Sequence, residues 1–193
     1  IDGSTTTDSE NVLVDGNTLT IKDEGVYVLN GSLTDGQIIV DAEDTDKIQI
    51  VLNNVQISNS SSAPIYIKKA DKVFVTLANN TENQLSVLGE FATIDENNID
   101  AAIFSKEDLT VNGSGTLTIK NEYGNGITSK DDLVITNGTY NINVLNHGIE
   151  GKNSVSIADG NFVIVAGNDG IHSENNEDTT LGNIYIQNGQ FDL

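Results

Sequence analysis

The stretch GNGITSKDDLVITNGTYNI, residues 124–142, decides the fold because versions of it recur along the chain. The aligned versions are DAAIFSKEDLTVNGSGTLTI from Asp100, NHGIEGKNSVSIADGNFVI from Asn146 and NDGIHSENNEDTTLGNIYIQNGQFDL from Asn168. Ile127, Ile149 and Ile171 follow one another at equal intervals, and Ile103 precedes Ile127 by a slightly longer interval. Such a fixed period, when it falls between about 20 and 50 residues, is typical of a repeat architecture.

Each repeat carries three short apolar runs, many of which alternate with polar residues at a period of two. This pattern predicts an all-β chain of strands three to six residues long, since no run of ten or more residues shows a helical period. One repeat then forms one coil of a parallel β-solenoid, and equivalent residues stack on the next coil at about 4.8 Å. Gly and Asn at the ends of the runs supply the left-handed backbone that the bends need.

The chain, residues 1–193, is expected to be a single domain of roughly eight coils of about 22 residues. Residues 100–193 hold the most regular coils. Residues 1–47 are expected to form irregular first coils that cap the solenoid, because an exposed end is a sheet edge that needs protection. Residues 78–100 are interpreted as a longer polar excursion before the repeats tighten.

Several columns of equivalent residues are expected to fill the core. They are Ile103, Ile127, Ile149 and Ile171; Leu109, Leu133 and Val155; Val111, Ile135 and Ile157; and Leu117, Tyr140, Phe162 and Phe191. A further column, Gly115, Gly138, Gly160 and Gly189, marks a bend.

Composition excludes several classes of protein. The formal net charge of −20 argues against a nucleic-acid partner, which would require clustered cations. The sequence has no stretch of 18 apolar residues, so no membrane span is predicted. No charged-then-apolar leader precedes Ile1, so we expect that any export signal was removed or was never present. The chain has no Cys, which excludes a disulfide framework and a thiolate metal site. We expect a monomer.

Residues 124–130, GNGITSK, do not form a phosphate-binding loop or an EF-hand. The spacing GxxxxGK[ST] is absent, and no helix is predicted after the glycines to present its N-terminus to a phosphate. The nonapeptide of calcium β-rolls is also absent.

Outward columns rich in Asp, Glu and Asn predict calcium sites between coils, because calcium takes six to eight oxygen ligands in irregular geometry. The alternative is an asparagine ladder, in which amides bond coil to coil without a metal. The candidate calcium ligands are Asp100, Asp108, Asn125, Asp131, Asp132, Glu150, Asn153, Asp169 and Glu174.

Lys106, Lys130 and Lys152 form a column of cations on a strongly acidic chain. Such a column favours a cationic track for a polymer whose carboxylates recur along its length. The alternative is that each lysine pairs with a nearby carboxylate, namely Glu107, Asp131 or Glu150.

Tyr66 and Phe104 follow inward isoleucines and are therefore expected to point outward, where their rings could stack on sugars. With Lys106, Lys130 and Lys152 they are the candidate substrate-binding residues. His147 and His172 fall in turns of neighbouring coils and are interpreted as polar surface.

The segments AAIFSKEDLTVNGSGTLTI, GNGITSKDDLVITNGTYNI, HGIEGKNSVSI and NDGIHSEN resemble a family of secreted bacterial carbohydrate-binding β-helix proteins. These proteins are similar to polysaccharide lyases and bind cellulose and acidic sugars such as polygalacturonate. The resemblance is tightest over residues 100–176 and also covers KIQIVLNNVQIS and PIYIKKADKVFVTL. It implies a right-handed parallel β-helix, bound Ca²⁺ and a secreted or cell-surface location.

The expected function is non-catalytic binding of a plant cell-wall polysaccharide. The first alternative is a calcium-dependent polysaccharide lyase in which Lys130 or Lys152 is the base, since the chain has no Arg. That role needs an uncharged lysine, whereas the surrounding carboxylates favour the ammonium. The second alternative is a structural or adhesive surface repeat that needs neither calcium nor sugar.

Overall fold

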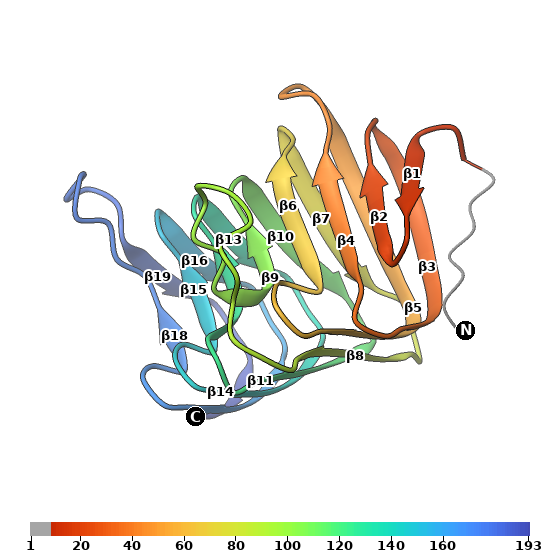
Figure 1. Cartoon of the computed structure of the whole chain (residues 1–193). Coiled ribbons are helices and arrows are strands. Elements are labelled where there is room, and N and C mark those ends of the chain that lie inside the picture. The colour runs from red at the N-terminus through yellow and green to blue at the C-terminus, as the bar shows by residue number, and fades with distance from the viewer. Residues whose placement is uncertain (1–8) are drawn as a thin grey trace.

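The computed structural model describes residues 9–193, which form an all-β structure of two sheets without a helix (Figure 1). The repeat units follow one another along the molecule, from β1 and β2 at the red end to β18 and β19 at the blue end. Every strand pair in these sheets is parallel except the pair β1–β2. None of the described elements is a helix that could span a membrane.

The smaller sheet has eight strands. In spatial order they are β1 (Val12–Asp15), β2 (Thr18–Ile21), β4 (Gln37–Asp41), β6 (Ile65–Lys69), β9 (Ala101–Ser105), β12 (Asn125–Ser129), β15 (Ile149–Gly151) and β18 (Ile171–His172). Because β1 runs antiparallel to β2, it covers the first parallel edge of this sheet.

The larger sheet has 12 strands. In spatial order they are β19 (Asn183–Ile186), β16 (Ser154–Ile157), β13 (Asp132–Ile135), β10 (Asp108–Gly113), β7 (Lys72–Leu77), β5 (Lys47–Asn59), β8 (Glu82–Val87), β11 (Thr116–Asn121), β14 (Thr139–Val144), β17 (Asn161–Ala166) and β20 (Gln190–Asp192). The remaining strand, β3 (Gly25–Leu33), pairs with β5.

Strand β5 divides the larger sheet into two arms. Its first half pairs with β7 and its second half pairs with β8. Asn54, with φ of 59°, lies between the halves, and this left-handed backbone bends the strand. From β6 onward, each repeat unit therefore contributes one strand to the smaller sheet and one to each arm, which confirms the prediction of three strands per period.

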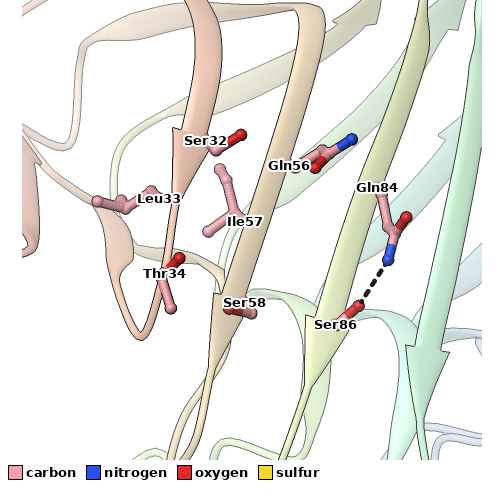
Figure 2. A pocket seen from close by; sticks show the side chains of 8 residues that line it. All are labelled: Ser32, Leu33, Thr34, Gln56, Ile57, Ser58, Gln84 and Ser86. Carbon is pink, nitrogen blue, oxygen red and sulfur yellow. Dashed lines mark hydrogen bonds between the residues drawn. The ribbon is translucent and has the colours of Figure 1, made fainter. Parts of the chain in front are cut away.

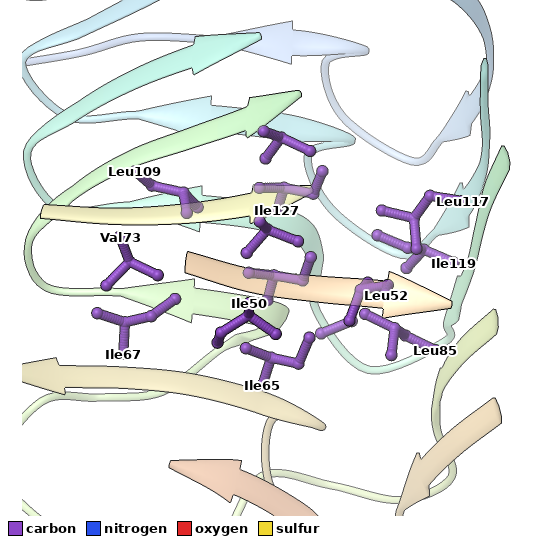
Figure 3. Packing of buried hydrophobic residues seen from close by; sticks show 14 of the residues in the cluster. Ile50, Leu52, Ile65, Ile67, Val73, Leu85, Leu109, Leu117, Ile119 and Ile127 are labelled. Carbon is purple, nitrogen blue, oxygen red and sulfur yellow. The ribbon is translucent and has the colours of Figure 1, made fainter. Parts of the chain in front are cut away.

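The registers confirm the predicted columns. Ile127 is paired with Ile103 and Ile149, and Ile149 is paired with Ile171. The leucine and valine columns pair as expected, and these side chains lie in one buried core between the sheets, with the partly buried Ile171 packed against it (Figure 3). Stacking identical positions at strand spacing thus buries a continuous apolar interior.

The aromatic column is also inside the core. The rings of Tyr140 and Phe162 stack at 4.9 Å between centroids, and those of Phe162 and Phe191 at 4.8 Å. Gly138, with φ of 130°, lies beneath the ring of Tyr140, where a Cβ would come within 2.9 Å of the ring carbons. Gly138, Gly160 and Gly189 are therefore required both by the backbone conformation and by the ring that covers each of them, whereas at Gly115 a Cβ would meet the carbonyl oxygen of Ala78.

The first repeats differ from expectation. The smaller sheet has seven parallel strands among residues 9–193, close to the roughly eight coils expected, and the early repeats are longer than the later ones. Ile38 pairs with Ile65, and Ile65 pairs with Ile103. Both sequence separations are longer than the period of the later repeats, and the second is the longer of the two. The predicted excursion over 78–100 is also partly regular, since it contains strand β8 and only residues 88–100 form an irregular segment.

Candidate functional site

Lys106, Lys130 and Lys152, here called the lysine column, directly follow strands β9, β12 and β15 of the smaller sheet. The N–H of Lys130 donates to the carbonyl of Ser105 at 2.8 Å, and the N–H of Lys152 donates to that of Ser129 at 2.9 Å. These bonds continue the parallel ladder, so the three lysines lie one strand apart along the stack, at about 4.8 Å per step.

The ion pairs of the lysine column differ from the expected ones. Lys130 Nζ lies 3.7 Å from Asp100 Oδ2 and 5.4 Å from the centroid of the Phe104 ring. Lys152 Nζ lies 2.9 Å from Glu177 Oε2, on an exposed part of the chain. Lys106 forms no ion pair with any residue from 9 to 193, so its ammonium is available to a ligand.

The two carboxylate oxygens of Asp100 lie in different environments. Its side chain is 41% exposed and its Oδ2 faces Lys130, whereas its Oδ1 is buried and has no hydrogen-bond partner among residues 9–193. Burial raises the pKa of Asp100 to about 6, although the charge of Lys130 acts in the opposite direction. The carboxyl group therefore changes charge in mildly acidic solution.

A pocket of about 620 Å³ lies at one end of the lysine column. Its lining is almost entirely charged or amide side chains: Asp41, Asp44, Lys68, Lys69, Asp95, Glu96, Asn97, Lys106 and Glu107. Lys68 follows Ile67, the partner of Ser105, and therefore extends the lysine column by one strand. The pocket offers both cations and hydrogen-bond acceptors to a polar ligand.

Tyr66 and Phe104 do not form an accessible aromatic platform, which corrects the sequence-based expectation. They are only 1% and 0% exposed. Both point away from the main core as expected, but Ile99 and Phe91 of the 88–100 segment pack over them in a second apolar cluster. Tyr66 Oη also donates to Asp95 Oδ2 at 2.5 Å and accepts from Asn97 Nδ2 at 2.6 Å.

Asp108, Asp131 and Asp132 form an acidic corner, in which one carboxylate oxygen of each lies within 4.8 Å of the others. Lys72 Nζ lies 3.6 Å from Asp108, and Ser154 Oγ donates to Asp132 at 2.7 Å. One ammonium group cannot neutralise three carboxylates, so the acidic corner fits a hard divalent cation. Calcium would take oxygen atoms from these residues and from nearby carbonyl groups.

An asparagine ladder, which was the alternative to calcium sites, is present beside the acidic corner. Asn153 Nδ2 donates to Asp131 Oδ1, and Asn175 Nδ2 donates to Asn153 Oδ1 at 2.7 Å. This ladder connects three successive repeat units without a metal. Asn153 is therefore occupied as a hydrogen-bonding group, whereas Asp132 accepts from Ser154 alone among residues 9–193.

The other predicted calcium ligands are dispersed. Asn125 Nδ2 donates to Glu150 Oε2 at 2.7 Å, and Thr128 Oγ1 lies 3.1 Å from the same oxygen, so this pair forms its own network. Asp100 pairs with Lys130 instead of joining a carboxylate group. Glu174 is exposed and belongs to neither of the possible metal-binding groups found over residues 9–193.

The sequence interpretation missed a group at Asp169. His147 Nδ1 and His172 Nδ1 lie 3.2 and 3.1 Å from Asp169 Oδ2, and the two imidazole rings stack at 4.1 Å between centroids. The signal was present, because His147 and Asp169 are separated by one full repeat and therefore stack on neighbouring units. The interpretation of the histidines as isolated polar surface residues was therefore wrong.

A second polar surface lies on the larger sheet, where β3, β5 and β8 run side by side (Figure 2). Ser32, Gln56, Gln84, Ser58 and Ser86 line a hollow of about 150 Å³, and Gln84 donates to Ser86 at 3.3 Å. These groups can form hydrogen bonds with hydroxyls, but none is ionisable. This hollow therefore differs from the lysine column and the acidic corner, which carry charged side chains.

The parallel sheets and the charged columns on their outer surface place the chain among all-β proteins whose stacked strands present lines of polar side chains. A family model described as "Carbohydrate-binding domain-containing protein" matches residues 15–193, so the chain belongs to the carbohydrate-binding domain family.

Two known proteins are similar to this chain. A "Carbohydrate-binding domain-containing protein" of Acetivibrio thermocellus is 40% identical over 120 residues, which cover 61% of this chain and 42% of that protein's length. A solved structure described as the polysaccharide lyase-like protein from C. thermocellum, gadolinium derivative, superposes with a TM-score of 0.89 and 38% identity. That match covers 95% of this chain and 75% of the other.

Proposed function

We propose that this chain binds plant cell-wall polysaccharides without cleaving them, and that the lysine column contacts the carboxylates of acidic polymers such as polygalacturonate. The observation that carries this proposal is the alignment of Lys106, Lys130 and Lys152 on successive parallel strands. A net charge of −20 repels an acidic polymer unless local cations offset it. The column supplies these cations in a line, which suits an extended chain.

Membership of the carbohydrate-binding domain family supports the class of ligand. Cellulose is the neutral candidate, for which the amide and hydroxyl groups beside Gln56 and Gln84 offer hydrogen bonds. The polymer of a plant cell wall lies outside bacterial cells, which supports a secreted or cell-surface location.

The proposal includes bound Ca²⁺ at the acidic corner. Three clustered carboxylates and one nearby ammonium support this choice. The related structure is described as a gadolinium derivative, and Gd³⁺ is also a hard cation that prefers oxygen ligands. Calcium bound at Asp108, Asp131 and Asp132 would lower the local negative charge and could bridge the protein to a polymer carboxylate.

We also propose that the repeat units wind as a right-handed parallel β-helix. Each strand pairs in parallel with its counterpart in the next unit, and the chain crosses both arms of the larger sheet before it returns. Crossover connections between parallel strands are right-handed in about 98% of cases, which supports this handedness.

Lyase activity is the second candidate function, and the name of the similar structure is its main support. The β-elimination needs a base that removes the proton next to a carboxylate. Lys130 and Lys152 each lie in an ion pair with a carboxylate, and an ammonium held in this way cannot accept a proton. This geometry favours binding over catalysis.

Retention on solid polysaccharide tests the proposal. The full chain is incubated with insoluble cellulose and with immobilised polygalacturonate, with Ca²⁺ or with chelator. We expect retention on at least one polymer, and weaker retention on polygalacturonate after chelation. Absence of retention on both contradicts binding. The release of unsaturated product that absorbs ultraviolet light would establish the lyase instead.

A further inference from the structure

We propose that His147, Asp169 and His172 bind one divalent transition-metal ion of the zinc class. The three ligand atoms come from two successive repeat units, since His147 and Gly148 precede β15, and Asp169 and His172 belong to the next unit at β18. Their ligand atoms all lie within 4.8 Å of one another. This histidine corner has no role in the polysaccharide binding proposed above.

The distances match the spacing of ligands around a small metal ion. Asp169 Oδ2 lies 3.2 Å from His147 Nδ1 and 3.1 Å from His172 Nδ1. Two ligands at about 2.0–2.1 Å from a tetrahedral zinc ion are about 3.3 Å apart, so both contacts already have the length of a coordination edge.

His147 and Asp169 face each other at this corner. The backbone N–H of Asp169 lies 3.4 Å from His147 Nδ1, and the nitrogen accepts this bond in the tautomer whose Nδ1 carries no proton. The same nitrogen faces a carboxylate oxygen at 3.2 Å. Without a metal, a proton on the nitrogen joins it to the carboxylate, and a cation bound to both atoms would take the place of that proton.

The ligand types select the class of metal. Imidazole nitrogen suits Zn²⁺, Cu²⁺, Ni²⁺ and Fe²⁺, whereas Ca²⁺ takes oxygen ligands. The whole sequence contains two His and no Cys, so these imidazoles are the only nitrogen or sulfur side chains of the kind that zinc prefers. The acidic corner, which has oxygen ligands only, is the contrasting site for a hard cation.

Binding requires a specific movement. The imidazole planes are 17° from parallel, and each Nδ1 lone pair lies in the plane of its own ring. Two nearly parallel rings cannot direct both lone pairs at one ion, so the rings must tilt away from their stack. The side chains of His147 and His172 are 20% and 26% exposed. Asp169 is 58% exposed and is therefore the ligand most accessible from solvent.

The first experiment uses the full chain after removal of metals by chelator. Zn²⁺ is titrated by calorimetry in the presence of millimolar Ca²⁺, and the ring nitrogens of both histidines are followed by ¹⁵N NMR. We expect one zinc ion per chain and a shift of both Nδ1 signals. Because the chain has two histidines, the spectrum assigns the site without any substitution.

The variants His147→Ala and His172→Ala are expected to weaken zinc binding by more than about tenfold each. Asp159→Asn is the matched control, because Asp159 is an exposed turn carboxylate that accepts a hydrogen bond from the N–H of Gly160. It should leave zinc affinity unchanged. Absence of zinc binding in the wild-type protein, or full affinity in both histidine variants, contradicts the proposal. Retention on polysaccharide is measured separately, so the two proposals fail independently.

Discussion

One outer column of the smaller sheet passes through two different environments. Tyr66 and Phe104, which are paired across β6 and β9, are buried beneath residues 88–100. Thr128, Glu150 and His172 continue the same column on β12, β15 and β18, where the side chains form polar contacts instead. Backbone register alone thus does not decide whether an outward position joins an apolar cluster or a polar network, since Thr128 is as fully buried as Phe104 but forms a hydrogen bond with Glu150.

The comparison assigns different roles to the two halves. The covered half has an additional apolar cluster that fixes the 88–100 segment to the sheet. The second half carries Lys130 and Lys152 with their carboxylate partners, and the histidine corner. The apolar cluster thus stabilises the first half, whereas the lysine column runs along both halves, from Lys106 after β9 to Lys152 after β15.

The largest expected effect is that of Phe104→Ala. Removing a fully buried ring should cost about 3–5 kcal/mol of stability. Thr128→Ala, at the paired position on β12, should cost about 1 kcal/mol through its lost hydrogen bond to Glu150. Urea midpoints measured for both variants test the difference. Equal shifts would show that the two halves of the column are energetically alike.

Tyr66→Phe should have a smaller and local effect. It removes the hydrogen bonds of Tyr66 Oη to Asp95 and Asn97 and should cost about 1–2 kcal/mol. Hydrogen exchange should become faster at the amides of residues 92–98. The control is Tyr140→Phe, whose hydroxyl bonds to the carbonyl of Asn137, far from that segment in the sequence. Unchanged exchange in Tyr66→Phe would mean that these bonds do not hold the segment.

The pH dependence of the stability of Asp100→Asn tests the boundary between the two halves. The folded pKa of about 6 lies above the ordinary value of 3.8, so ionisation of Asp100 opposes folding at pH 7 and the cost disappears below about pH 4. Because the side chain is 41% exposed, solvent reduces the effect. We expect the variant to melt about 1–3 °C higher at pH 7.5 in chelator, with no gain at pH 4. A gain that is independent of pH would contradict this assignment.

Lys152→Gln should have the smallest effect on stability, within about 0.5 kcal/mol, because its ion pair with Glu177 is exposed. Thermal melting measures this change. A loss as large as that of Tyr66→Phe would mean that the lysine column is a structural element, and would weaken its assignment to ligand binding.

The repeat made much of the fold predictable from sequence. Columns such as Ile127–Ile149 could be aligned because equivalent residues in a parallel stack keep one register over each period. The same logic placed the lysine column and brought Asp108, Asp131 and Asp132 to one corner. Features that follow the period are therefore the ones that the sequence predicts.

The misses have a common physical cause. Residues 88–100 have no counterpart in the other repeats, so no column could indicate that Phe91 and Ile99 cover Tyr66 and Phe104. Ion-pair partners depend on long side chains that reach across columns, as in the pair of Lys130 with Asp100. In the histidine corner, Asp169 lies one repeat after His147 and three positions before His172. No single column of equivalent residues contains all three, so the columns did not predict the group.

The most direct test of the central claim is the affinity for soluble polygalacturonate of two variants with the same loss of charge. The first, Lys106→Gln with Lys130→Gln, removes two members of the lysine column. The second, Lys47→Gln with Lys120→Gln, removes two lysines of the larger sheet. The account predicts that the first variant binds about 10- to 100-fold more weakly than the wild type, and that the second loses much less affinity. Equal loss in both variants, or none in the first, would contradict a binding role for the lysine column.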